Sequence, residues 1–317
     1  MLKDRAVGVS LPRNLPADRI VDFARATERL GFDELWIVED CFFRGGIAQA
    51  SVALSSTATI HVGVGILPAA ARNAAFATLE VNTLAELFPG RTTIGVGHGM
   101  PGWMRQVGAW PASPLTMLEE TISAMRALLH GETLSVEGRY VRLRDVALES
   151  AAANPPLVVA GVRGPKSLEV SGRVADGTVL AEPVTPEYLA AVRTQVGASR
   201  PHRVVAYNVA AVHPDAAVAR DLARTRLDWV GESDGRVHIE PLPFADEFFA
   251  LRASVGSPEA FAAALPDAWV DQLAVVGTPG MARSRLRELH DAGAHSVVLL
   301  PAGPDPFAAL EALAELV

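Results

Sequence analysis

The sequence predicts an α/β fold, a TIM (β/α)₈ barrel of eight parallel strands and surrounding helices, with insertions. Eight short and almost continuously apolar segments have the length and composition of strands that are buried on both faces. Helical segments alternate with them, and 317 residues suffice for the roughly 250 of such a barrel plus insertions. An open, doubly wound sheet is the alternative, because sequence alone does not fix how many strands pair.

The amino-terminal half is expected to be a run of strand–helix units. An apolar strand at 6–11 leads into an amphipathic helix at 17–30. The turn between them contains Pro12 and Pro16, and Gly31 follows the helix as its C-cap. The further strands of this half are expected at 35–38, 60–67 and 92–96, and its further helices at 47–56 and 73–87.

The carboxyl-terminal half continues the alternation around a hairpin and two insertions. Gly138 in the segment VEGRY marks the turn of the hairpin. A loop rich in Gly, Pro and Trp near 97–114 and an irregular stretch near 231–257 are expected as insertions into a single domain that spans 1–317. The strands are expected at 157–160, 177–180, 204–212 and 296–300, and the helices at 115–129, 166–172, 186–196, 215–229, 279–292 and 306–316.

Composition argues against several classes of partner and site. The net charge is −8, from 28 Lys and Arg against 36 Asp and Glu, and the basic residues are scattered, so we expect neither nucleic acid nor a membrane as a partner. The single cysteine, Cys41, cannot form an internal disulfide, and the first residues do not resemble a signal peptide, so we expect a cytoplasmic protein. The eight histidines lack metal-ligand spacing, and we expect no metal site.

Three residues that follow predicted strands are candidates for proton transfer. The working groups of such barrels lie at the carboxyl-terminal ends of the strands. Glu39 and Asp40 are adjacent at one of these ends, so strand alternation turns one of them toward the barrel mouth. Pairing with Arg44, or capping of the next helix, is the structural alternative. His98 follows the fourth strand among glycines, where it serves either proton transfer or a structural hydrogen bond.

The ends of several strands carry glycine or proline, where larger side chains would crowd a planar ligand. Such ends favour a flat cofactor that rests against the backbone. The residues concerned are Gly65 and Ile66 after the third strand, Gly97 after the fourth, and Gly161 and Val162 after the fifth.

The fifth strand runs into the turn GVRGPK, which is expected to seat a phosphate group. Pro165 begins the next helix, whose backbone N–H groups and dipole attract anions, and Arg163, Gly164 and Lys166 lie beside it. The alternative is that the glycines serve only the geometry of a short turn. The glycines of IGVGHGMPGW are not interpreted as a dinucleotide fingerprint, because no helical run is expected to follow them.

Four segments carry a resemblance to a known family. They are ATERLGFDELWIVED, VGVGILPAAARNAAFATLEVNTLAELFPGRTTIGVGHG, GPKSLEVSGRVADGTVL and VVGTPGMARSRLRELHDAGAHSVVLLP. Together they resemble the bacterial-luciferase-like superfamily of flavin- and coenzyme F420-dependent oxidoreductases, and in pattern most of all its methylene-tetrahydromethanopterin reductase branch. The resemblance implies a luciferase-like barrel with extra loops.

The same resemblance implies a flavin or 5-deazaflavin ring across the barrel mouth. A strand bulge with a non-prolyl cis peptide, which supports the ring in the deazaflavin enzymes, maps onto Gly65 and Ile66. The phosphate seat of the family maps onto 163–166, and its acidic residue after the second strand maps onto Asp40. The family also implies a homodimer, with the apolar helix at 74–87 as a candidate surface, although burial against the barrel would explain the same apolarity.

The predicted function is that of an oxidoreductase that transfers a hydride between bound coenzyme F420 and a small organic substrate. The segment GMPGWMRQVGAWPASP contains two Trp and two Met, which favours an apolar substrate. The first alternative is a luciferase-like monooxygenase that uses reduced FMN and oxygen, and the second is a non-enzymatic cofactor- or ligand-binding barrel.

Overall fold

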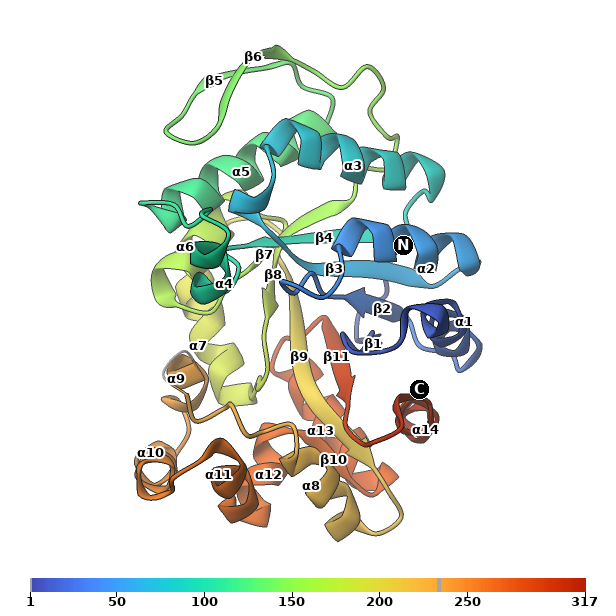
Figure 1. The fold of residues 1–317 in the computed structure, drawn as a ribbon, viewed down its shortest axis with the longest axis vertical. Helices are drawn as coiled ribbons and strands as arrows, with labels where there is room; N and C mark the ends of the chain where they lie inside the picture. Colours follow the sequence, from blue (N-terminus) through green and yellow to red (C-terminus); the bar gives the residue numbers. More distant parts are fainter. Residues whose placement is uncertain (1, 233–234) are drawn as a thin grey trace.

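The computed structural model describes residues 2–232 and 235–317 and contains a closed parallel barrel (Figure 1). Eight strands follow one another around it in chain order. The barrel closes because β11 pairs with β1, and β9 pairs with both β8 and β11. The strands are β1 (Ala6–Ser10), β2 (Glu34–Ile37), β3 (His61–Pro68), β4 (Thr92–Gly97), β7 (Leu157–Gly161), β8 (Gly177–Leu180), β9 (Arg203–Val212) and β11 (Ser296–Pro301). The predicted barrel is confirmed, and the open sheet is excluded.

Helices cover the outside of the barrel, because the outward side chains of a buried sheet need an apolar partner. Leu35 and Val64 of the strands belong to the same buried cluster as Phe23 and Ile122 of the helices. Within the described ranges, none of the helices combines the length and the apolarity that crossing a bilayer requires. The covering helices are α1 (Ile20–Arg29), α2 (Gly46–Ser56), α3 (Ala74–Leu87), α5 (Pro114–Leu129), α6 (Pro165–Val174), α7 (Pro186–Val196), α13 (Pro279–Asp291) and α14 (Pro306–Leu313).

The predicted hairpin lies outside the helical layer (Figure 1). It consists of β5 (Leu134–Glu137) and β6 (Arg142–Val146), which pair antiparallel. The Glu120 carboxylate of α5 accepts hydrogen bonds of 2.8–2.9 Å from the backbone N–H groups of residues 139–141 in the turn. One carboxylate therefore anchors the hairpin to the barrel.

The stretch near 231–257, of which residues 233–234 lie outside the described residues, contains two helices, which corrects the expectation of an irregular stretch. It contains α9 (Arg236–Ile239) and α10 (Ala245–Ser254). Their apolar side chains join a second buried cluster, in which the Phe244 and Trp269 rings stack with centroids 4.8 Å apart. Helix formation here depends on this packing, because the helices are short and the sequence shows little periodicity.

The chain between the second insertion and the last βα unit adds further elements that the sequence did not predict. The helices α11 (Pro258–Ala264) and α12 (Asp267–Leu273) precede β10 (Val275–Gly277), which pairs with the end of β9. The helix α8 (Ala216–Arg224) ends at Arg224, so the predicted end at Trp229 is wrong.

The loop near 97–114 contains a short helix, α4 (Pro101–Gln106). Pro101 occupies its first turn, where the missing N–H group needs no partner. The expectation that no helical run follows the glycines of this segment is therefore wrong. The dinucleotide-fingerprint interpretation still fails, because the fold is a closed barrel.

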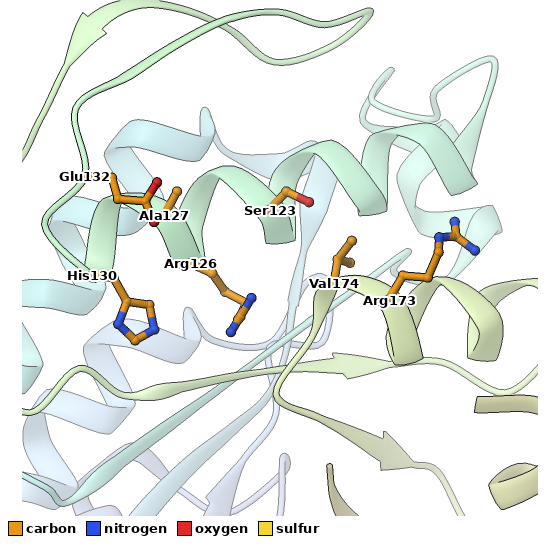
Figure 2. Close-up of a pocket in the computed structure, with 7 residues that line it drawn as sticks. All are labelled: Ser123, Arg126, Ala127, His130, Glu132, Arg173 and Val174. Atoms are coloured by element: carbon orange, nitrogen blue, oxygen red, sulfur yellow. The ribbon is translucent and has the colours of Figure 1, made fainter. Parts of the chain in front are cut away.

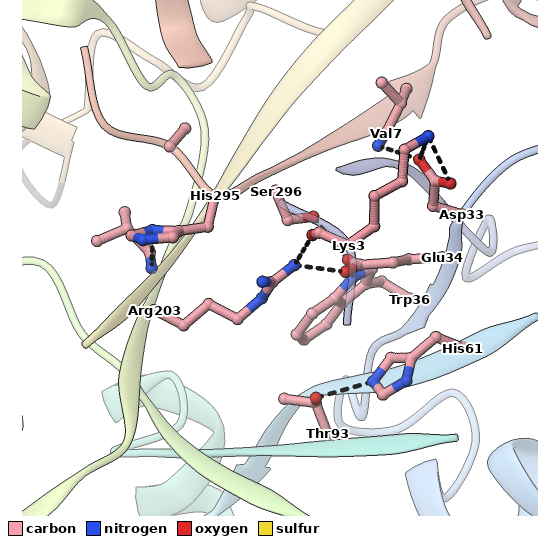
Figure 3. A network of polar contacts seen from close by, with 12 residues as sticks. Lys3, Val7, Asp33, Glu34, Trp36, His61, Thr93, Arg203, His295 and Ser296 are labelled. Atoms are coloured by element: carbon pink, nitrogen blue, oxygen red, sulfur yellow. Dashed lines mark hydrogen bonds and ion pairs between the residues drawn. The ribbon is translucent and has the colours of Figure 1, made fainter. Parts of the chain in front are cut away.

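A polar network fills the amino-terminal end of the barrel (Figure 3). The buried Glu34 carboxylate accepts hydrogen bonds from the Trp36 indole at 2.7 Å, the Ser296 hydroxyl at 2.6 Å and the Arg203 guanidinium at 3.0 Å. His61 donates to or accepts from the Thr93 hydroxyl at 2.8 Å, and burial lowers its pKa to about 4. This end is closed by paired polar groups, so the carboxyl-terminal ends of the strands are left as the open end, called the mouth below.

Candidate active site

A bulge in β3 lies at the mouth, where the sequence placed it. Val64 pairs with Ile94 and Leu67 pairs with Val96, so Gly65 and Ile66 together occupy the space opposite one residue of β4. The Gly65–Ile66 peptide bond is cis, as the family resemblance implied. Both residues are half-buried and therefore reach the accessible surface.

The Ile66 side chain explains the glycines at the ends of β4 and β7. A Cβ atom at Gly161 would lie 2.2 Å from Ile66 Cγ2, and one at Gly97 would lie 3.1 Å from Ile66 Cγ1. The sequence pattern predicted that these glycines present bare backbone to a planar ring. The structure corrects this interpretation, because the Ile66 side chain occupies the space that they leave. A ring at the mouth would meet Gly65 and Ile66 first.

Glu39 is fixed in a structural role. Its carboxylate forms a two-pronged ion pair with Arg72, at 2.5 and 2.8 Å, and accepts a hydrogen bond of 2.6 Å from the N–H of Gly46 in the first turn of α2. The helix-capping alternative is therefore the observed one. Arg44 pairs with neither carboxylate and donates instead to the Arg13 carbonyl at 3.1 Å.

Asp40 is the member of the acidic pair whose charge reaches the groups at the mouth. Its carboxylate accepts a hydrogen bond of 2.9 Å from Arg13, and its side chain is 27% exposed. The Arg13 guanidinium also lies over the Phe43 ring, 5.0 Å from its centroid. Asp40 and Arg13 therefore form an ion pair at the mouth.

His98 contacts the helical layer. Its Nε2 lies 3.0 Å from the Ser167 hydroxyl in the first turn of α6, and its ring also bonds to the backbone of Pro114. Burial lowers the pKa of His98, so the neutral ring is favoured. These contacts fit the structural alternative, in which His98 holds the start of α6.

The turn after β7 is open at the amino terminus of α6. Gly164 is the N-cap and Pro165 the first helical residue, so the N-cap residue itself offers no side chain to the start of this helix. A Cβ atom at Gly164 would meet nothing within 4 Å. The Arg163 carbonyl accepts a hydrogen bond of 2.9 Å from the Tyr188 hydroxyl, which fixes the turn, and Lys166 is exposed beside it. Val162, by contrast, is buried behind the turn.

Two further groups lie near the mouth that the sequence analysis did not select. Glu182 follows β8, where burial raises the pKa of its carboxyl group. Tyr207 of β9 is buried, and its hydroxyl has no hydrogen-bond partner among the described residues. Glu182 follows the sixth predicted strand in the segment VLAEPV, just as Glu39 and Asp40 follow the second. The same strand-end pattern therefore predicts Glu182 as a candidate.

A hollow of about 270 Å³ lies elsewhere, between α5 and α6 on the outside of the barrel (Figure 2). Its two cations are already paired, Arg126 with Asp176 at 2.6 Å and Arg173 with Glu119 at 2.9 Å. We therefore place the candidate site at the mouth. In the described part of the chain, no three His, Cys, Asp or Glu side chains are arranged to hold a metal ion.

The barrel and its mouth agree with what comparison with known proteins shows. The model of the luciferase-like monooxygenase family matches residues 4–296, so the chain belongs to this family and is an oxidoreductase. The 5,10-methylenetetrahydromethanopterin reductase of Methanolobus tindarius is 27% identical over 325 residues, which cover 96% of this chain and 97% of that relative.

Two solved structures share the fold of the whole chain. The coenzyme F420 dependent tetrahydromethanopterin reductase of Methanopyrus kandleri has a TM-score of 0.85 and 20% identity, with 98% of both chains covered. The oxygenating constituent of 3,6-diketocamphane monooxygenase of Pseudomonas putida, in complex with FMN, has a TM-score of 0.71 and 16% identity, with 100% of this chain and 98% of the other covered. The predicted family and fold are confirmed.

Proposed function

We propose that this protein transfers a hydride between bound coenzyme F420 and a small, apolar organic substrate. The observation that carries the proposal is the uncapped start of α6 at Gly164, which opens at the same end of the barrel as the accessible bulge at Gly65 and Ile66. An anion seat and a ring support at one end of a barrel suit a cofactor with a planar ring and a phosphate-bearing tail.

The residues present fit such a cofactor. The ring would rest on Gly65 and Ile66, with Gly97 and Gly161 behind the Ile66 side chain. The phosphate would take the N–H groups of the turn at 163–166, beside the charges of Arg163 and Lys166 and in front of Val162. When bound, a deazaflavin accepts or donates a hydride and does not activate oxygen.

In this proposal the ion pair of Asp40 and Arg13 lies at the mouth beside the cofactor. The contacts of Glu39 and His98 favour positioning roles for these two residues. Exposed apolar side chains in the loops around the mouth favour an apolar substrate. Phe42, after β2, is 67% exposed, and Met100, after β4, is 40% exposed.

FMN is the second candidate cofactor, in a monooxygenase that uses reduced flavin and oxygen. Its support is the FMN complex of the Pseudomonas putida enzyme, which has the same barrel. We favour F420 because the reductase of Methanolobus tindarius matches nearly the whole chain and the Methanopyrus kandleri enzyme has the higher TM-score. The non-enzymatic barrel is disfavoured by the family to which the chain belongs.

We also propose a homodimer that forms through α3. One face of this helix is buried against the barrel, but Phe76, Leu79 and Leu87 on another face are 70%, 52% and 65% exposed. Val52 of the neighbouring α2 is 41% exposed. An apolar face of this kind is stabilised when a second copy covers it.

Titration of the purified protein with oxidised F420, reduced F420 and reduced FMN, followed by absorbance and by melting temperature, tests the cofactor. Saturable binding of F420 is expected. At a hundredfold excess over the dissociation constant, binding adds about 2.7 kcal/mol, which for this chain length raises the melting temperature by about 4 °C. Binding of FMN without binding of F420 would overturn the proposal.

A further inference from the structure

Glu182 stands on a rigid segment at the mouth. It lies just beyond the end of β8 at Leu180 and is partly accessible. The Pro183 carbonyl accepts a hydrogen bond of 3.1 Å from His238 Nδ1, and the N–H of Val184 donates one of 3.0 Å to the Asn208 side chain. The backbone beyond Glu182 is thus held from two other elements, α9 and β9.

The topology places Glu182 and Asp40 over the same opening. In the ring of eight strands, β8 and β2 lie opposite each other, with three strands between them on either side. The charge of Asp40 nevertheless contributes to raising the pKa of Glu182. Both residues follow the carboxyl-terminal ends of their strands, so both belong to the loops around the mouth.

Charged and titratable groups from four further parts of the fold lie near Glu182 or influence its protonation. Arg163 after β7 and Arg226 after α8 both favour the ionised form of Glu182, although less strongly than burial opposes it. The Tyr207 hydroxyl of β9 lies 2.5 Å from where a Cβ atom of Gly65 would be. Burial raises the pKa of Tyr207, and Glu182 adds to this effect. His238 of α9 is buried, and burial keeps its ring neutral by lowering its pKa to about 3.

The other acidic and basic candidates at this end of the barrel are already engaged. Glu39 is bonded to Arg72 and to the start of α2, and His98 to Ser167 and Pro114. Asp40 is held by Arg13. Glu182 combines partial access with an environment whose largest influence, burial, favours the neutral acid and so raises its pKa.

We propose that Glu182 is the catalytic acid and base that exchanges a proton with the substrate. This inference rests on the proposed hydride transfer. In the oxidative direction, a substrate that carries H–C–O–H or H–C–N–H loses a hydride from carbon, and the bound deazaflavin takes up this hydride with its two electrons. The Glu182 carboxylate forms a bond to the proton released from O–H or N–H, and a C=O or C=N bond forms. The reverse direction returns the same proton, so the substrate class is an alcohol and carbonyl pair or an amine and imine pair.

Infrared spectroscopy tests the protonation of Glu182 without a substrate. In a pH titration, the wild-type protein should keep the carbonyl stretch of a neutral carboxyl group, shifted in D₂O, to higher pH than an ordinary glutamate does. The band should be missing in Glu182→Gln and present in Glu187→Gln, a matched change at an exposed residue in the first turn of α7. Absence of the band from the wild type overturns the proposal.

Kinetics with F420 and a panel of small secondary alcohols, amines and ketones tests the catalytic role. Glu182→Gln should lower kcat by about 100- to 10,000-fold, with the dissociation constant of F420 changed by less than about twofold. The pH dependence of kcat/KM should follow the pH dependence of the infrared band. A Glu182→Gln rate within about threefold of the wild type overturns the proposal. Failure of the wild type to bind F420 would refute the proposed function, and the infrared band would then still decide whether Glu182 holds a proton.

Discussion

Replacement of Gly161 by alanine perturbs the contact on which the shape of the mouth depends. The new Cβ atom would lie 2.2 Å from Cγ2, 3.3 Å from Cβ and 3.4 Å from Cγ1 of Ile66. Cγ2 is attached to the branched Cβ atom, so it cannot yield without rotation about χ1 or movement of the bulge. Gly161→Ala should therefore displace Ile66 from the surface on which we place the cofactor ring.

The expected loss of stability follows from overpacking, which typically costs about 1–3 kcal/mol. An unfolding entropy of about 2.1 cal/mol/K per residue gives about 0.67 kcal/mol/K for 317 residues. The melting temperature should fall by about 1.5–4.5 °C. Binding of F420 should weaken as well, because Ile66 is part of the proposed ring support.

Urea unfolding and fluorescence titration with F420 measure both effects. Gly256→Ala is the control, since a Cβ atom there would meet nothing within 4 Å, and it should stay within about 0.5 kcal/mol of the wild type. Adding Ile66→Ala removes Cγ2, so the double variant should lose less stability than the sum of the single variants. Additive losses, or a Gly161→Ala variant as stable as the control, would refute this account of the mouth.

Three further predictions concern stability and assembly. Arg203→Met leaves the buried Glu34 carboxylate without its cation and should lower the free energy of unfolding by about 3–5 kcal/mol in urea, whereas a loss near zero would contradict the network. Burial opposes the ionised form of Glu28, but backbone N–H groups of residues 58–60 outweigh it and lower its pKa from 4.5 to about 2. The stability contributed by Glu28 is therefore fully present above its unfolded pKa and is lost as the pH falls from about 4.5 toward about 2. In acid unfolding followed by circular dichroism, Glu28→Gln should lack the loss of stability that the wild type shows in this pH range. Phe76→Lys should convert a dimer to a monomer in sedimentation equilibrium, while Val218→Lys, an exposed apolar position on α8, should not; a dimeric Phe76→Lys variant would exclude α3 as the interface.

The elements that follow from local pattern were predicted closely. The strands at 35–38 and 92–96 and the helix at 186–196 are apolar or amphipathic runs with clear boundaries, and they form where the sequence placed them. The helices in 231–257 were missed because their stability comes from packing against residues such as Phe261 and Trp269, which follow later in the chain. Periodicity does not report on such partners.

The amino-acid sequence by itself indicated the barrel, the family, the place of the bulge at Gly65 and the turn at Gly164, since apolar runs and short motifs along the chain carry these features, and the structure then excluded the open sheet. Only the tertiary structure decided that Glu39 caps a helix, that Ile66 fills the space beside Gly161, and that the strands preceding Glu182 and Asp40 lie on opposite sides of the barrel. The physical reason is that the protonation and packing of a side chain depend on neighbours that folding brings from distant strands, whereas the tendency to form a strand or a helix lies largely in the order of apolar and polar residues along the chain.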